Sequence, residues 1–137
     1  MLQEVVKLRT SDNIVEYLAE ASGQGLAVAL VKCRRGFFKG LKCHALVFKV
    51  YKQNGKFVLE KLLLENGKKG TRVIKKSVSQ LPDEVAVKLI NHYYDDAKQI
   101  RQANKIHHTM MLVTEAIDDL KVVDESVNDF VEEFQEY

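Results

Sequence analysis

Apolar residues along the chain follow two different periods, and the change falls near residue 81. Between residues 26 and 78, apolar side chains occur in short runs or alternate with polar ones, which is typical of β-strands. From residue 82 onward they recur three and four positions apart, which is typical of amphipathic helices. The pattern predicts a basic β-rich region over residues 1–81 and a helical region over residues 82–137, together forming one compact domain.

The clearest local signal is the dipeptide Asn54-Gly55, which favours a two-residue type I′ turn between antiparallel strands. Pairing outward from this turn sets apolar residues opposite apolar residues and an acid opposite a base, which stabilises a hairpin. The predicted pairs are Gln53–Lys56, Tyr51–Val58, Val50–Leu59, Lys49–Glu60, Val47–Leu62 and Leu46–Leu63.

Three further segments have strand character. Residues 26–31 form a short run of small apolar and β-branched residues, which predicts a central strand buried on both faces. Residues 71–78 follow a turn at Asn66-Gly67 and Gly70, and their lysines are typical of an edge strand. Residues 1–9 fit either an edge strand or a lead-in turn, and we interpret them as a strand.

Helices are expected at both ends of the chain. Thr10, Ser11 and Asp12 are good N-caps, and apolar residues at helical spacing follow until Gly23, which predicts a short N-terminal helix. Pro82 opens a second helical segment whose apolar stripe slips in phase near residue 103. We read this segment as one long helix, either continuous or interrupted near residue 104, followed by an acidic terminal helix.

A helix of about 38 residues would measure about 57 Å and extend beyond a small sheet. A coiled-coil homodimer or a bent helical hairpin would resolve that mismatch. The predicted fold class is therefore α+β, with an antiparallel meander sheet of four to five strands, a short N-terminal helix and a long C-terminal helical segment. The sheet is expected either to lie open under the long helix or to close into a small barrel.

Charge is sorted along the sequence, although the whole chain of 137 residues carries only +2. The net charge is −2 over residues 1–30, +12 over residues 31–80 and −8 over residues 81–137. Such segregation creates a directional field, and a strongly basic region attracts polyanions.

The basic region centres on the segment CRRGFFKGLKC, residues 33–43, in which cations flank two phenylalanines. Cations neutralise phosphates and exposed aromatic rings stack on bases, so this composition favours nucleic-acid binding. The alternative is that Phe37 and Phe38 pack in the core and the cations only solvate the surface. The candidate nucleic-acid-binding residues are Arg34, Arg35, Phe37, Phe38, Lys39 and Lys42, with Lys68, Lys69, Arg72, Lys75 and Lys76 as a second basic surface.

The acidic terminal helix carries an apolar stripe that needs a partner or a place in the core. It is a candidate for docking into a groove on another protein, for folding over the chain's own basic face, or for remaining a solvated surface helix. The candidate partner-binding residues are Val127, Phe130, Val131, Phe134 and Tyr137.

Other chemistry has no clear motif in the sequence. The adjacent His107 and His108 point in different directions on a helix, so no metal site is predicted, and neither a cofactor nor a catalytic constellation is expected. Cys33 and Cys43 could bridge across the loop, although we expect buried thiols, and the absence of a signal or spanning segment predicts a cytoplasmic protein.

These observations predict a non-enzymatic accessory protein. It would bind DNA or RNA backbone through the basic sheet and loop, and a partner protein or its own copy through the C-terminal helices, with no membrane or small-molecule ligand. The alternative is a regulator that acts on a larger enzyme through its helices and never contacts nucleic acid.

Overall fold

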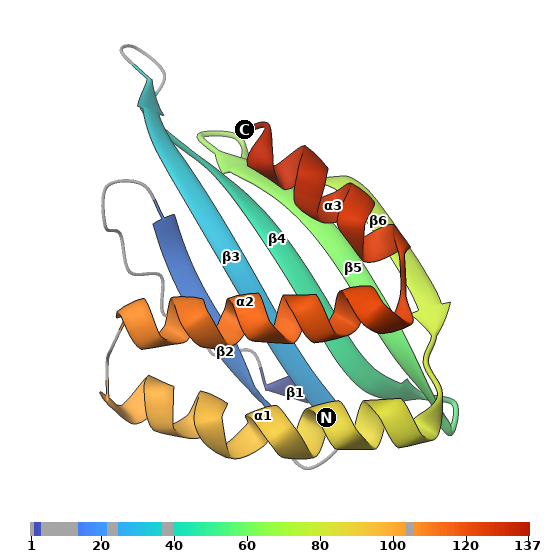
Figure 1. Ribbon diagram of the computed structural model, residues 1–137. Coiled ribbons are helices and arrows are strands. Elements are labelled where there is room, and N and C mark those ends of the chain that lie inside the picture. The colour runs from blue at the N-terminus through green and yellow to red at the C-terminus, as the bar shows by residue number, and fades with distance from the viewer. Residues whose placement is uncertain (1, 4–13, 22–24, 37–39, 104–105) are drawn as a thin grey trace.

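The computed structural model describes residues 2–3, 14–21, 25–36, 40–103 and 106–137. The elements are β1 (Leu2–Gln3), β2 (Ile14–Ala21), β3 (Gly25–Gly36), β4 (Gly40–Gln53), β5 (Lys56–Gly67), β6 (Gly70–Gln80), α1 (Asp83–Ala103), α2 (Ile106–Val123) and α3 (Ser126–Gln135). Figure 1 shows one antiparallel sheet with all three helices lying across one of its faces.

The strands follow one another in the order β1-β2-β3-β4-β5-β6, so the predicted meander is confirmed. The four long strands β3 to β6 make up most of the sheet, and β2 and the two-residue β1 continue it on one side. Among the described strands β1 and β6 do not pair with each other, so the sheet is open and the barrel alternative is wrong. The edge position predicted for residues 71–78 is confirmed, because they lie in β6.

The hairpin around Asn54-Gly55 forms with the predicted register. Both turn residues have positive φ, 54° and 78°, as a type I′ turn requires. All six predicted pairs, from Gln53–Lys56 to Leu46–Leu63, are present between β4 and β5. Strand β3 is also central and buried on both faces over most of residues 26–31, as the small apolar run predicted.

The predicted N-terminal helix is wrong, because the segment Ile14–Ala21 is the strand β2. It pairs with β3 from Ile14 opposite Lys32 to Ala19 opposite Ala27. A helix of this length is marginal in isolation, whereas pairing with a buried neighbour satisfies the backbone. The β-branched Ile14 and Val15 and the aromatic Tyr17 also favour a strand.

The predicted interruption near residue 104 separates two helices, since α1 ends at Ala103 and α2 begins at Ile106. The continuous helix is therefore wrong, and the interrupted alternative is confirmed. In Figure 1, α1 and α2 run side by side in opposite directions across the sheet, which is the bent helical hairpin that resolves the length mismatch. Helix α3 then crosses β4 and β5 near the end of the sheet where the chain terminates.

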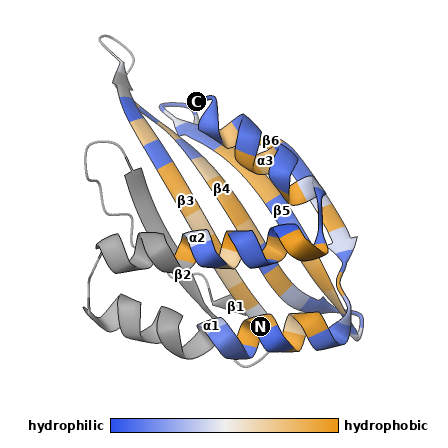
Figure 2. Cartoon of the chain, viewed as in Figure 1, coloured by the Kyte–Doolittle hydropathy of each residue, from blue (hydrophilic) through white to orange (hydrophobic). Residues whose placement is uncertain are grey.

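The core lies between the sheet and the helices. Alternate residues of β3, β4 and β5 face inward, among them Val28, Phe48 and Leu59, and meet the buried stripes of the helices. In Figure 2, β3 and β4 are mostly apolar where the helices cross them, and polar bands appear on β3 toward the end that extends beyond the sheet. That polar end contains Arg34, Arg35 and Lys42, three of the predicted nucleic-acid-binding residues.

Candidate nucleic-acid interface

Strands β3 and β4 extend past their neighbours. Among the described residues, the last β2 residue that pairs with β3 is Ile14, which lies opposite Lys32. The pairing between β4 and β5 ends at Cys43, which lies opposite Asn66. Further out, the described residues pair across the hairpin itself, as Arg34–Lys42, Arg35–Leu41 and Gly36–Gly40. We call residues 34–36 and 40–42 the hairpin arm, and Figure 1 shows it projecting from the sheet.

A disulfide joins the two strands at the base of the hairpin arm. Cys33 and Cys43 are directly opposite each other in the ladder, with Cα atoms 4.0 Å apart, and their sulfurs are bonded. The predicted pair of buried thiols is therefore wrong. The two cysteines are ten positions apart in sequence. The glycines between them are compatible with several strand registers, so the sequence alone did not predict whether the two cysteines lie opposite each other.

Side chains on the helix-covered face bring several cations to this end of the sheet. Lys42 lies opposite Arg34, and two rungs further in, on the same face, His44 lies opposite Lys32. The same rung continues through Glu65 on β5 to Arg72 on β6. Four strands thus contribute to one row of polar side chains.

The turn between β5 and β6 adds further positive charge at the same end. Gly40 has a positive φ of 70°, and a Cβ at this position would lie only 3.0 Å from the Lys68 side chain. Lys68 therefore lies against the start of β4, beside the hairpin arm. We call the cations gathered here the basic corner: Lys32, Arg34, Lys42, Lys68, Lys69 and Arg72.

Glu65 partly neutralises the basic corner. Its carboxylate lies 3.2 Å from Lys42 Nζ and 3.0 Å from a guanidinium nitrogen of Arg72, and 3.4 Å from His44 Nε2. Hydrogen bonds from Arg72 and Lys42 lower the pKa of Glu65, so it stays ionised. Within the described chain Arg34, Lys68 and Lys69 have no acidic partner within ion-pair distance.

The predicted second basic surface divides between two faces. Arg72 belongs to the basic corner, but Lys75 lies under α3, 4.0 Å from Glu133. Lys76 points to the opposite face, where it lies 3.4 Å from Glu60. Of the loop candidates, Arg35 pairs with Leu41 in the hairpin arm, whereas Phe37, Phe38 and Lys39 lie outside the described residues.

The predicted partner-binding stripe on α3 packs against the chain's own sheet. Val127, Phe130 and Phe134 are buried in the core, and Val131 and Tyr137 pack partly buried against it. The stripe thus fills the space above β4 and β5, and it does not face outward in this conformation.

The acidic helix α3 also covers cations of the sheet. Lys32 Nζ donates hydrogen bonds to the backbone carbonyls of Phe134 and Gln135, at 3.1 and 3.3 Å. The Lys75 ammonium lies 4.7 Å from the centre of the Phe130 ring, within the range of a cation–π contact. Of the three alternatives for the acidic helix, this placement corresponds to the one in which it folds over the chain's own basic face.

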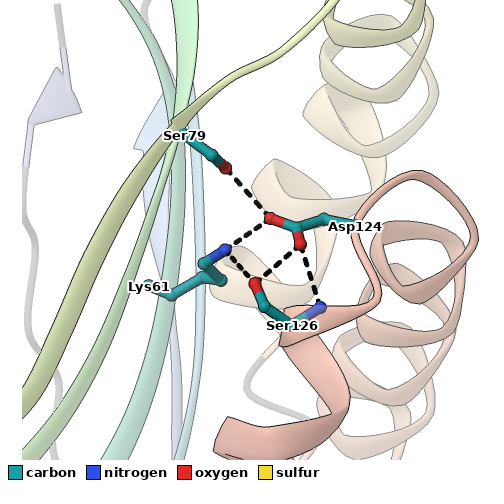
Figure 3. Close-up of polar contacts among 4 residues, drawn as sticks. All are labelled: Lys61, Ser79, Asp124 and Ser126. Carbon is teal, nitrogen blue, oxygen red and sulfur yellow. Dashed lines mark hydrogen bonds and ion pairs between the residues drawn. The ribbon is translucent and has the colours of Figure 1, made fainter.

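Sequence reasoning missed Lys61, the one buried charged residue in the described part of the chain, with 1% of its surface exposed. Its ammonium is hydrogen-bonded to Asp124 and Ser126, and Ser79 Oγ donates to the same carboxylate at 2.9 Å (Figure 3). Lys61 lies at an inward-facing position of β5, between Leu59 and Leu63. The alternation of inward and outward residues along a strand could have predicted that its side chain is buried.

Asp124 sits between α2 and α3 and anchors the start of α3. Its Oδ1 accepts hydrogen bonds from the Ser126 backbone N–H at 3.0 Å and from the Ser126 hydroxyl at 2.6 Å. Although burial acts to raise its pKa, hydrogen bonds from Lys61, Ser126 and Ser79 lower the pKa of Asp124 to about 2. This cluster has every member hydrogen-bonded within the fold, which identifies it as a structural anchor between sheet and helix.

Neither a metal centre nor a membrane span emerges from the described residues. No group of three or more His, Cys, Asp or Glu side chains in this part of the chain could hold an ion. No helix among the described segments is long and apolar enough to cross a bilayer.

The fold and the basic corner define a class: an open antiparallel meander sheet, covered on one face by three helices, with a cationic hairpin arm at one end. Neither a family model, nor a curated protein, nor a solved structure matches the chain.

Proposed function

We propose that this chain is a non-enzymatic nucleic-acid-associated accessory protein that binds DNA or RNA backbone through the basic corner. The observation that supports it best is the convergence of cations from β3, β4, the β5–β6 turn and β6 beside a projecting hairpin arm. Clustered cations neutralise successive phosphates and release their counterions, which drives association.

The placement of positive charge suits a backbone-directed contact. Arg34 is exposed on the hairpin arm, and Lys68 and Lys69 are exposed in the adjacent turn. Guanidinium and ammonium groups on neighbouring strands can reach different phosphates of one strand. Affinity is therefore expected to depend steeply on salt and weakly on sequence.

The decisive experiment titrates fluorescently labelled DNA and RNA with the protein at several salt concentrations. We expect micromolar or tighter binding at low salt, with a steep loss as salt rises. The double variant R34A/K42A should bind more weakly and lower the salt slope by about two. K56A/K88A is the matched control, because Lys56 and Lys88 are exposed cations away from the basic corner.

Two outcomes would contradict the proposal. Wild-type protein that binds no nucleic acid at low salt removes it entirely. Equal losses in R34A/K42A and K56A/K88A would show that binding follows overall charge and has no site at the basic corner.

A protein-binding regulator remains the second candidate, and exposed apolar residues of the helices favour it. Val122 is 85% exposed at the end of α2, next to the partly exposed Val123. We propose the outward side of the helices as the surface for a partner protein or a second copy. Sedimentation equilibrium of wild type and V122D distinguishes these cases, because a homodimer through this surface would dissociate in the variant.

A further inference from the structure

His44 lies within the basic corner with its imidazole face covered by a single aromatic ring. The rings of His44 and Tyr137 are stacked, with centroids 3.8 Å apart and planes inclined by 7°. Tyr137 lies beyond the last residue of α3, so the covering ring is attached to the end of the acidic helix. The arrangement has the geometry in which an aromatic side chain holds a flat, unpaired base.

The covering ring is held by weak polar contacts. The Tyr137 hydroxyl donates to Glu133 at 3.5 Å, and its backbone N–H donates to the Phe134 carbonyl at 3.3 Å. Its side chain is partly exposed, whereas Phe134 one turn earlier is buried in the core. Tyr137 can therefore move without loss of the buried stripe that holds α3 on the sheet.

Cations surround the His44 ring on several strands. Lys32 lies opposite it on β3, Lys42 lies two residues before it on β4, and Arg72 lies two strands away beyond Glu65. A base stacked on His44 would thus carry its flanking phosphates into a positive field. A base inside a duplex cannot use this surface, because its faces are already stacked on its neighbours.

Resting on the function proposed above, we propose that the basic corner binds single-stranded nucleic acid by stacking one unpaired base on His44, in the place that Tyr137 occupies in the free protein. Tyr137 is then an intramolecular competitor. If it covers His44 about nine-tenths of the time, the apparent affinity is about tenfold below that of the uncovered site.

The test compares a labelled single-stranded oligonucleotide with a duplex of the same length. Y137A should bind the single strand about two- to tenfold more tightly and the duplex unchanged, because only the stacking site is uncovered. Y137F is the matched control, since it keeps the covering ring and loses only the hydroxyl, so its affinity should equal that of wild type. Removal of the whole of α3 is not used, because its stripe belongs to the core.

A second variant tests the other ring. H44A should weaken single-strand binding about fivefold or more and leave duplex binding nearly unchanged. H92A is its control, because His92 is an exposed imidazole on α1. Thermal unfolding of each variant, and its duplex affinity, report whether the fold is intact.

The outcomes separate this inference from the proposed function. Binding of single strand and duplex that is unaffected by Y137A and H44A, or affected equally for both ligands, overturns the stacking site and leaves phosphate binding in place. Absence of any binding by wild type at low salt overturns both.

Discussion

At the residue scale, Glu65 determines how much of the positive charge of the basic corner is available to bind an anionic ligand. Its carboxylate is within ion-pair distance of Lys42 and Arg72, two cations of the basic corner. An anionic ligand must compete with this carboxylate for both cations.

The substitution E65Q should release those two cations and remove a repelling charge. We expect nucleic-acid affinity to rise about two- to fivefold at low salt, with a steeper salt dependence. Fluorescence anisotropy titrations at two ionic strengths measure both effects.

E60Q is the matched control for Glu65. Glu60 is an acid of the same strand that pairs with Lys76 on the opposite face, 3.4 Å away. Equal gains in E60Q and E65Q would mean that the response follows net charge and does not depend on release of Lys42 and Arg72.

At the element scale, the ion pair between Lys61 and Asp124 adds a polar attachment to the apolar stripe that holds α3 on the sheet. The Lys61 ammonium is buried, and removal of its counterion leaves an uncompensated charge in the core. We expect D124N to lower the free energy of unfolding by about 3 kcal/mol, measured by urea denaturation.

D118N gives the comparison for that loss. Asp118 forms an exposed pair with Lys121 on α2, at 3.6 Å, and such pairs contribute less than about 0.5 kcal/mol. A D124N protein as stable as D118N would show that the buried pair does not hold α3 in place.

The Asp124 carboxylate also makes the free energy of unfolding depend on pH. The pKa of Asp124 is about 2 in the folded chain against an ordinary value of 3.8, so its ionised form is favoured by folding. Its contribution is fully present above about pH 4 and is lost as the pH falls toward 2, which amounts to about 1–2 kcal/mol after solvent screening. Urea denaturation of wild type between pH 5 and pH 2 should show this loss, and D124N should lack it.

The hairpin arm is joined at its base by one covalent cross-link. A two-stranded ribbon is marginal by itself, and the Cys33–Cys43 bridge closes it where the sheet pairing ends. We expect C33A/C43A to lose about 2–3 kcal/mol of stability and to bind nucleic acid more weakly.

Addition of reductant is the control for the disulfide. It should lower the melting temperature of wild type toward that of C33A/C43A and leave the variant unchanged. Titration of two free thiols in the native, unreduced protein would contradict the bridge.

The sequence predicted those parts of the fold that depend on local signals. The Asn54-Gly55 turn and its alternating flanks were sufficient for the register of β4 and β5. The segment Ile14–Ala21 was misread because the spacing of its apolar residues fits both a helix and a strand. Its pairing with β3 stabilises the strand. The disulfide depends on the register of the β3–β4 hairpin, which its loop residues did not reveal. The period of two could have placed Lys61 inward, but its pairing with Asp124 depends on tertiary structure.

The candidate site was predicted in part. The sequence identified most of its cations, such as Arg34, Lys42 and Arg72, from composition. It did not separate Lys75 and Lys76, which are consecutive in β6 and therefore point to opposite faces of the sheet. Glu65, His44 and Tyr137 were not associated with the cations, since their proximity depends on three strands and a helix that are distant in sequence.

At the scale of the whole molecule, the meander order has a consequence for how the chain folds. Each strand pairs with the one that precedes it, so the sheet can grow one hairpin at a time from the Asn54-Gly55 turn. Contacts of short sequence separation lose little loop entropy before they form, which favours rapid folding for a β-rich protein. The docking of α3 on β4 and β5 joins residues far apart in the chain, and we expect it to complete the process.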